Sequence, residues 1–162
     1  MDDKEHRQID TWADGHAAWA DLLEGTTQTL IVADHDLSGI HRDGRDVTDR
    51  LLRCLQRLHP GSVRLIVRDT RALLNDMPRT RQLLIDYGHV ACVRIAAAHH
   101  KRELDRSVVV SDAQHGLVRP QFDHPRAQLL LNDPAGVGRH IPQLETIWAS
   151  ASNASIGAVL GL

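Results

Sequence analysis

Two apolar runs of the sequence are each followed by a cluster of cationic side chains. The runs cover 63–67 and 90–95, and the cations after them are Arg68, Arg71, His99, His100, Lys101 and Arg102. Guanidinium and ammonium groups are suited to binding phosphate. If both runs are parallel strands, their carboxyl ends lie at one edge of a sheet, where ligands bind in such folds. We therefore expect all of these residues except Arg102 to form an anion-binding site, with a solvated polar loop as the alternative.

Acidic side chains follow a third apolar run, TLIVA at 29–33. They are Asp34 and Asp36, with His35 between them and Ser38 just after. Asp favours turns because its side chain hydrogen-bonds to nearby backbone groups, so both aspartates are explained as turn or cap residues. The D-x-D-x-Ser spacing also resembles the first motif of haloacid dehalogenase-type phosphotransferases. That resemblance implies Asp34 as nucleophile, Asp36 as acid/base and a magnesium ion, but the spacing to later motifs is compressed.

Metal-ligand residue types are present in the same loops, at His35, Asp36, Asp69, His99 and His100. They suit zinc or a harder divalent ion. However, two adjacent histidines on a loop rarely face one ion, and the chain has no ligand-spacing signature such as HExxH. Asp69 is explained more simply as a cap of the segment that follows it. We expect no metal and no cofactor.

The elements that position these side chains follow from the hydrophobic pattern. Apolar residues at steps of three and four predict helices, and short runs rich in β-branched residues predict strands. Helices are expected at 8–24, from Asp46 to Pro60, at 76–87 and at 136–151, and strands at 29–33, 63–67, 90–95, 107–110 and 116–119. Residues 128–132 are expected to form either a short edge strand or a helical turn.

The order of these elements predicts an α/β fold. Strands that alternate with helices are parallel, because crossover helices connect them. The last two strands are separated only by SDAQH, which is too short for a crossover and predicts an antiparallel hairpin. We expect a single domain over 1–162, with a mixed sheet of three parallel strands plus the hairpin and helices on both faces. Residues 1–7 are expected to be a flexible N-terminus, and 153–162 an apolar tail that docks on the core or mediates self-association.

Composition and charge argue against several classes of protein. The formal net charge is −2 and aromatic residues make up 3% of the chain, whereas nucleic-acid binders have a basic excess and aromatic stacking platforms. No run approaches the roughly 20 apolar residues of a membrane span. The N-terminus is too charged for a signal peptide, and Cys54 and Cys92 lack a disulfide spacing. We expect a cytoplasmic protein whose main partner is not nucleic acid.

Three segments, TLIVADHDLSG, VRLIVRDTRAL and LDRSVVVSDAQHGLVRP, together resemble the phospholipase D-like superfamily. Within it, the chain is most similar to an uncharacterised bacterial family of degenerate domains, some of which are attached to GNAT-type acetyltransferases. The resemblance runs from the first helix to ETIWASAS and implies one half of a phospholipase D-like enzyme.

Active members of that superfamily carry H-x-K-x4-D followed by a Gly-Ser-x-x-Asn stretch. The His attacks phosphorus, the Lys neutralises phosphate oxygens and the Asp helps to orient the site. Aligning the strand on this sequence places Asp105 at the His position, Ser107 at the Lys position and Asp112 at the Asp position. Only the aspartate is retained. A second H-x-K exists at His99 and Lys101, but its Asp would fall on position 106, which is an arginine.

The resemblance therefore implies a module without the catalytic set of its relatives. We expect a non-catalytic binding or interaction role at the carboxyl edge of the sheet. The ligand is unknown, with phosphate-bearing molecules as the candidates, and a homodimer or an acetyltransferase is the expected protein partner. The alternatives are a metal-dependent phosphoryl-transfer enzyme that uses Asp34 and Asp36, or a phosphodiesterase or nuclease that uses His99 and Lys101.

Overall fold

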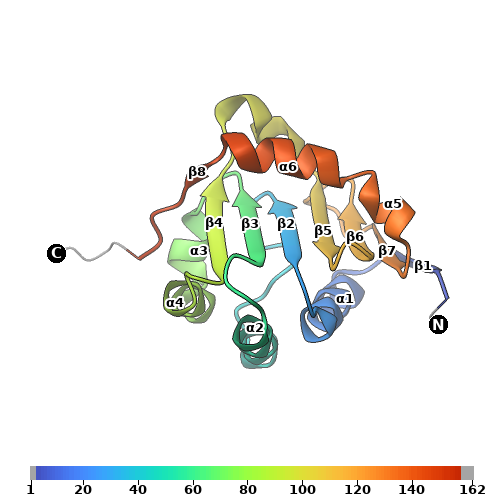
Figure 1. Cartoon of the computed structure of the whole chain (residues 1–162), viewed down its shortest axis with the longest axis horizontal. Helices are drawn as coiled ribbons and strands as arrows, with labels where there is room; N and C mark the ends of the chain where they lie inside the picture. Colours follow the sequence, from blue (N-terminus) through green and yellow to red (C-terminus); the bar gives the residue numbers. More distant parts are fainter. Residues whose placement is uncertain (1–2, 158–162) are drawn as a thin grey trace.

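The computed structural model describes residues 3–157, which contain one eight-stranded mixed sheet (Figure 1). The strand order is β1-β7-β6-β5-β2-β3-β4-β8. The predicted parallel strands are β2 (Leu30–Asp34), β3 (Val63–Val67) and β4 (Ala91–Ile95), and the predicted hairpin is β5 (Ser107–Ser111) with β6 (His115–Arg119). Strand β2 pairs in parallel with β3 and antiparallel with β5, so the hairpin extends the sheet beyond β2. The predicted mixed α/β fold is confirmed.

Three further strands complete the two edges of the sheet, and they correct the predictions for both ends of the chain. They are β7 (Ala127–Leu131), β1 (Glu5–Ile9) and β8 (Ser152–Asn153). Residues 128–132 therefore lie mostly in a strand and do not form a helical turn. Strand β1 pairs antiparallel with β7, although its residues were expected in a flexible N-terminus and at the start of a helix. Only Ile9 of β1 is buried, so the run lacks the alternation that signals a strand.

The helices follow the predicted positions, with two of them divided. The first two are α1 (Trp12–Gly25) and α2 (Arg45–Arg57). The helix predicted at 76–87 is replaced by α3 (Arg71–Asp76) and α4 (Pro78–Asp86), and the one at 136–151 by α5 (Pro134–Gly138) and α6 (Ile141–Ser150). The break before α4 falls at Met77, since a residue that precedes proline disfavours the helical conformation. A 3₁₀ helix, η1 (Ala98–Asp105), leads into β5.

Helices cover both faces of the sheet, as predicted (Figure 1). Helices α1, α2 and α4 pack on one face around Leu23, Leu55 and Leu84, and α6 crosses the other face with Leu144 and Ile147. None of the helices in the described part of the chain has the length and apolarity needed to cross a bilayer.

The described part of the C-terminal tail docks on the core. Ala154 and Ile156 pack against the larger apolar cluster, and Arg81 donates from Nε to the carbonyl oxygen of Ile156 at 2.7 Å. The rest of the predicted apolar tail, 158–162, lies outside the described residues.

Candidate functional site

Two of the predicted anion-binding cations are paired with acids close to them. Arg68 pairs with Asp105 at 3.1 Å, and Arg71 pairs with Asp69 at 3.2 Å. The hydrogen bond from Arg71 lowers the pKa of the Asp69 carboxyl, which favours the ionised form that pairs with this arginine. Within residues 3–157, no ion pair or hydrogen bond joins either arginine to the side chains of 99–101.

The His99-His100-Lys101 segment lies in η1, which follows β4, whereas Arg68 follows the neighbouring strand β3. The two imidazole rings lie 4.1 Å apart between their centres, and His100 contacts Glu103 through Nδ1 at 3.2 Å. In a 3₁₀ helix, residues two apart point about 120° away from each other, because the repeat is 3.0 residues. His99 and Lys101 therefore do not present the shared face that an H-x-K pair has on a strand.

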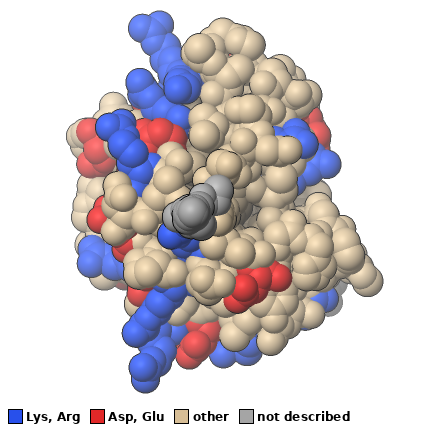
Figure 2. Space-filling view, turned by 90° about the vertical axis from the view of Figure 1, so that its left-hand side faces the viewer, with Lys and Arg blue, Asp and Glu red and all other residues tan. Residues whose placement is uncertain are grey.

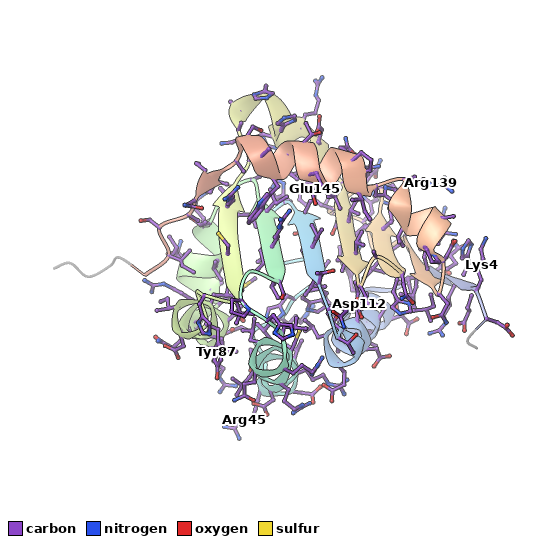
Figure 3. All side chains as sticks on the ribbon, viewed as in Figure 1. Lys4, Arg45, Tyr87, Asp112, Arg139 and Glu145 are labelled. Carbon is purple, nitrogen blue, oxygen red and sulfur yellow. The ribbon has the colours of Figure 1, made fainter. Side chains whose placement is uncertain are left out.

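The three positions of the phospholipase D motif are divided between the two ends of β5. Asp105 ends η1, is half-exposed and pairs with Arg68. Ser107 begins β5 and is 1% exposed. Asp112 follows the other end of the strand, so it lies at the edge of the sheet opposite to the carboxyl end of β2 (Figure 3).

Asp112 has a structural role at that opposite edge. Its carboxylate accepts hydrogen bonds from the backbone amides of Thr27, Gln28 and Thr29 at 2.7–3.2 Å, and from the Thr27 hydroxyl. Partial burial alone would raise the pKa of Asp112, but the backbone donors lower it on balance. The only retained member of the motif therefore holds a turn before β2.

The aspartates after β2 also have structural roles. Asp34 is 2% exposed and accepts backbone hydrogen bonds from Leu37 at 2.7 Å and from Asp36 at 3.2 Å. These bonds hold a turn in which Leu37 has a φ of 74°. Burial raises the pKa of Asp34, although a hydrogen bond from Ser107 opposes the rise. Asp36 accepts from both the backbone amide and the hydroxyl of Ser38.

Sequence reasoning missed Arg119, which lies beside Asp34 and Ser107. Arg119 ends β6 directly opposite Ser107, so both side chains lie on the face of the sheet covered by α1. Arg119 is 1% exposed, and its Nε, Nη1 and Nη2 atoms have no hydrogen-bond partner among the described residues. Arg119 could have been found from the sequence, because side chains alternate along a strand and GLVR therefore puts Arg119 on the same buried face as Leu117.

Helix α1 packs directly against this guanidinium. The Cζ atom of Arg119 lies 4.8 Å from the centre of the Trp12 ring. A Cβ atom placed on Gly15 would lie 2.7 Å from Nη2, so any other residue here would require the guanidinium to shift. Burial lowers the pKa of Arg119, and attraction to Asp34 opposes that shift.

A surface hollow lies beside this buried group. It has a volume of about 350 Å³ and is lined by Trp12, His16, Ser38, Gly39, Arg42, Phe122 and Asp123. His16 hydrogen-bonds to the Gly39 carbonyl through Nε2 at 3.1 Å, and burial lowers the pKa of its imidazole. Phe122 stacks on His35 with ring centres 3.8 Å apart, which fixes the loop that closes the hollow.

The metal-ligand types after the strands do not converge. Across residues 3–157, no group of three or more His, Cys, Asp or Glu side chains is arranged to hold a metal ion. His35 stacks on Phe122 while Asp69 is paired with Arg71.

Comparison with known proteins supports the fold but gives no activity. Solved structures similar to this chain include Nuc from Salmonella typhimurium, a phospholipase D family member (10% identity, TM-score 0.65, 94% of this chain and 99% of that chain). NucT from Helicobacter pylori is similar at 10% identity with a TM-score of 0.61, over 94% of this chain and 100% of that chain.

A third similar structure is TrmBL2, an archaeal chromatin protein with a novel mode of DNA binding (11% identity, TM-score 0.65). The match covers 92% of this chain but 54% of TrmBL2, so this chain spans about half the length of that protein. No curated protein matches the sequence. At these identities the likeness concerns the fold, which is phospholipase D-like. Residues 11–156 match the model of one family, and the chain therefore belongs to the family described as Domain of unknown function (DUF7931).

Proposed function

We propose that this chain is a non-catalytic phospholipase D-like module that binds a phosphate-bearing ligand at the carboxyl edge of its sheet. The proposal depends on the residues at two positions of the phospholipase D motif, Asp105 just before β5 and Ser107 at its start. Asp105 is ion-paired with Arg68, and Ser107 is buried at 1% exposure.

These two residues cannot supply the chemistry that the resemblance would require. A carboxylate at the nucleophile position repels a phosphodiester, and a buried hydroxyl gives no positive charge to the phosphorus centre. Nucleophilic and electrostatic catalysis each account for several orders of magnitude in rate. A chain that lacks both is expected to bind a phosphate-bearing ligand without cleaving it.

The haloacid dehalogenase-like alternative is disfavoured by the position of Asp34. A nucleophilic carboxylate must reach the phosphorus atom with a free oxygen. The Asp34 carboxylate is 2% exposed and holds the turn after β2 through Leu37 and Asp36. Moving it toward a substrate would break that turn.

Nucleic acid is not the ligand that the charge distribution favours. On the face beside β4 and β8, basic side chains are interspersed with acidic ones (Figure 2). The net charge of −2 also disfavours approach to a phosphate backbone, whereas nucleic-acid binders carry a basic excess.

The proposal is tested by a hydrolysis assay. Purified protein is incubated with bis(4-nitrophenyl) phosphate and, separately, with 4-nitrophenyl phosphate, each in magnesium and in EDTA. We expect the wild type, His99→Ala and Asp34→Asn to release nitrophenolate at the rate of buffer alone. Diester hydrolysis that is lost in His99→Ala, or magnesium-dependent hydrolysis that is lost in Asp34→Asn, would contradict the proposal and identify which alternative is correct.

A further inference from the structure

Arg119 carries a buried positive charge without a hydrogen-bonding partner among the described residues. Its guanidinium has five N–H groups, and all three nitrogen atoms are buried. Buried charges in proteins are paired, because a charge without a partner in a low-dielectric interior is strongly unfavourable. The fold nevertheless keeps this charge beside the hollow, as is expected of a group that binds a ligand.

The neighbouring residues compensate Arg119 only in part. Asp34 attracts it electrostatically, but its carboxylate accepts from backbone amides of the turn after β2. Within residues 3–157, the two side chains form no ion pair of 4 Å or less. Trp12 covers one face of the guanidinium, and an aromatic face accepts no hydrogen bond from the N–H groups at the guanidinium edge. A water molecule there would satisfy N–H groups without neutralising the charge.

The hollow beside α1 lies next to the guanidinium but does not include it among its lining residues. Trp12 lines the hollow and also lies over Arg119, so its ring separates the two. His16 lines the hollow as well, and it is close enough to Arg119 for the positive charge to lower its pKa. Trp12 is the first residue of α1 and is only partly buried, so its ring borders solvent on one side and can turn toward it.

We propose that Arg119 anchors a small oxyanion, a phosphate or carboxylate group of a ligand, that enters from the hollow when the Trp12 ring turns aside. A guanidinium matches both groups because its N–H donors pair with two oxygen atoms at once. This inference rests on the proposed binding function and names the residue and the ligand chemistry that serve it.

The test compares thermal unfolding and calorimetric titration of the wild type with those of Arg119→Met. Inorganic phosphate and acetate are the probes, and sodium chloride at equal ionic strength is the reference. We expect one or both anions to raise the Tm of the wild type beyond the chloride reference, and the stronger anion identifies the ligand group. In Arg119→Met the anion effect is lost, while the Tm without anion rises by roughly 3–6 °C because an unpaired buried charge has been removed.

Two further variants keep the test decisive. Arg57→Met is the matched control, because the Arg57 guanidinium donates to the carbonyl oxygens of Leu23, Glu24 and Thr26 at the other edge of the sheet. It should lower the Tm and leave the anion effect unchanged. Arg119→Lys, which keeps the charge without the paired donors, should weaken anion binding by about tenfold or more.

Two results would overturn the inference. The first is a wild type that neither phosphate nor acetate stabilises beyond chloride. The second is an anion effect that persists in both Arg119 variants. Either result leaves the absence of hydrolysis untouched, because turnover is measured separately with the aryl phosphates. Turnover in that assay would instead refute the non-catalytic function, whatever Arg119 binds.

Discussion

Asp112 hydrogen-bonds to three consecutive backbone amides, and it does so in a left-handed conformation with a φ of 55°. In the superfamily that the sequence resembles, this position completes a catalytic motif. Here it ties the turn after β5 to the segment that enters β2. A residue of the same type at the motif position therefore carries no information about activity in this chain.

The first prediction concerns this residue. Asp112→Ala removes the acceptor of four donor groups and places alanine at a positive φ, so we expect the free energy of unfolding to fall by about 2–4 kcal/mol. Asp112→Asn keeps one acceptor oxygen and tolerates the left-handed conformation, so it should lose about half of that. Urea unfolding measures both values. Equal stability of Asp112→Ala and the wild type would disprove the structural role.

At the scale of elements, a buried polar chain links the loop after β2 to α4. Trp19 donates from Nε1 to Nδ1 of His41 at 3.0 Å, which leaves the imidazole proton on Nε2 facing Thr80 at 2.7 Å. The Thr80 hydroxyl in turn donates to Asp43 at 2.6 Å, and Asp43 also accepts the backbone amides of Arg79 and Thr80 at the start of α4. The network requires a neutral His41, because Nδ1 must remain an acceptor.

This network predicts a loss of stability in mild acid. Burial lowers the pKa of His41 from 6.5 to about 4, so between these values the unfolded chain binds a proton that the folded chain does not. His41 therefore contributes stability above pH 6.5 that is lost as the pH falls toward 4, by about 3 kcal/mol in total.

The comparison that isolates His41 is urea unfolding of the wild type and His41→Gln at pH 7, 5 and 4. Other groups titrate in both proteins, so only the difference between them reports on this imidazole. The free energy of unfolding of the wild type should exceed that of the variant at pH 7, and this difference should shrink as the pH falls. A constant difference between the two proteins across this range would contradict the prediction.

At the scale of the whole molecule, the sequence predicted the centre of the sheet well and its edges poorly. Strands β2, β3 and β4 are mostly apolar because helices cover both of their faces, and such short runs are readable directly even though β3 and β4 each contain one arginine. Strand β1 is an edge strand whose exposed residues have no reason to be apolar. Two predicted helices are interrupted, at Met77 and before Ile141, although their apolar spacing remains helical. A proline follows each interruption within two residues.

The candidate site was predictable only in part. The sequence placed charged side chains at the carboxyl edge of the parallel strands, and their binding of an anion stays a prediction. The pairing of Arg68 with Asp105, and of Arg71 with Asp69, depends on three-dimensional contacts that spacing does not encode. Arg119 was missed because a buried, unpaired arginine is rare, although the alternation along β6 placed it on the inner face.

For the whole molecule, we propose that a phospholipase D-like fold lacks the nucleophile of its relatives and serves as a binding module. The most direct measurement is intact-protein mass spectrometry after incubation with bis(4-nitrophenyl) phosphate. A histidine that attacks phosphorus would expel one nitrophenolate and carry the remaining 4-nitrophenyl phosphoryl group through an N–P bond. We predict an unmodified mass, in agreement with the absence of a strand histidine at position 105. An acid-labile phosphoryl adduct on His99, or on any other histidine, would contradict this claim.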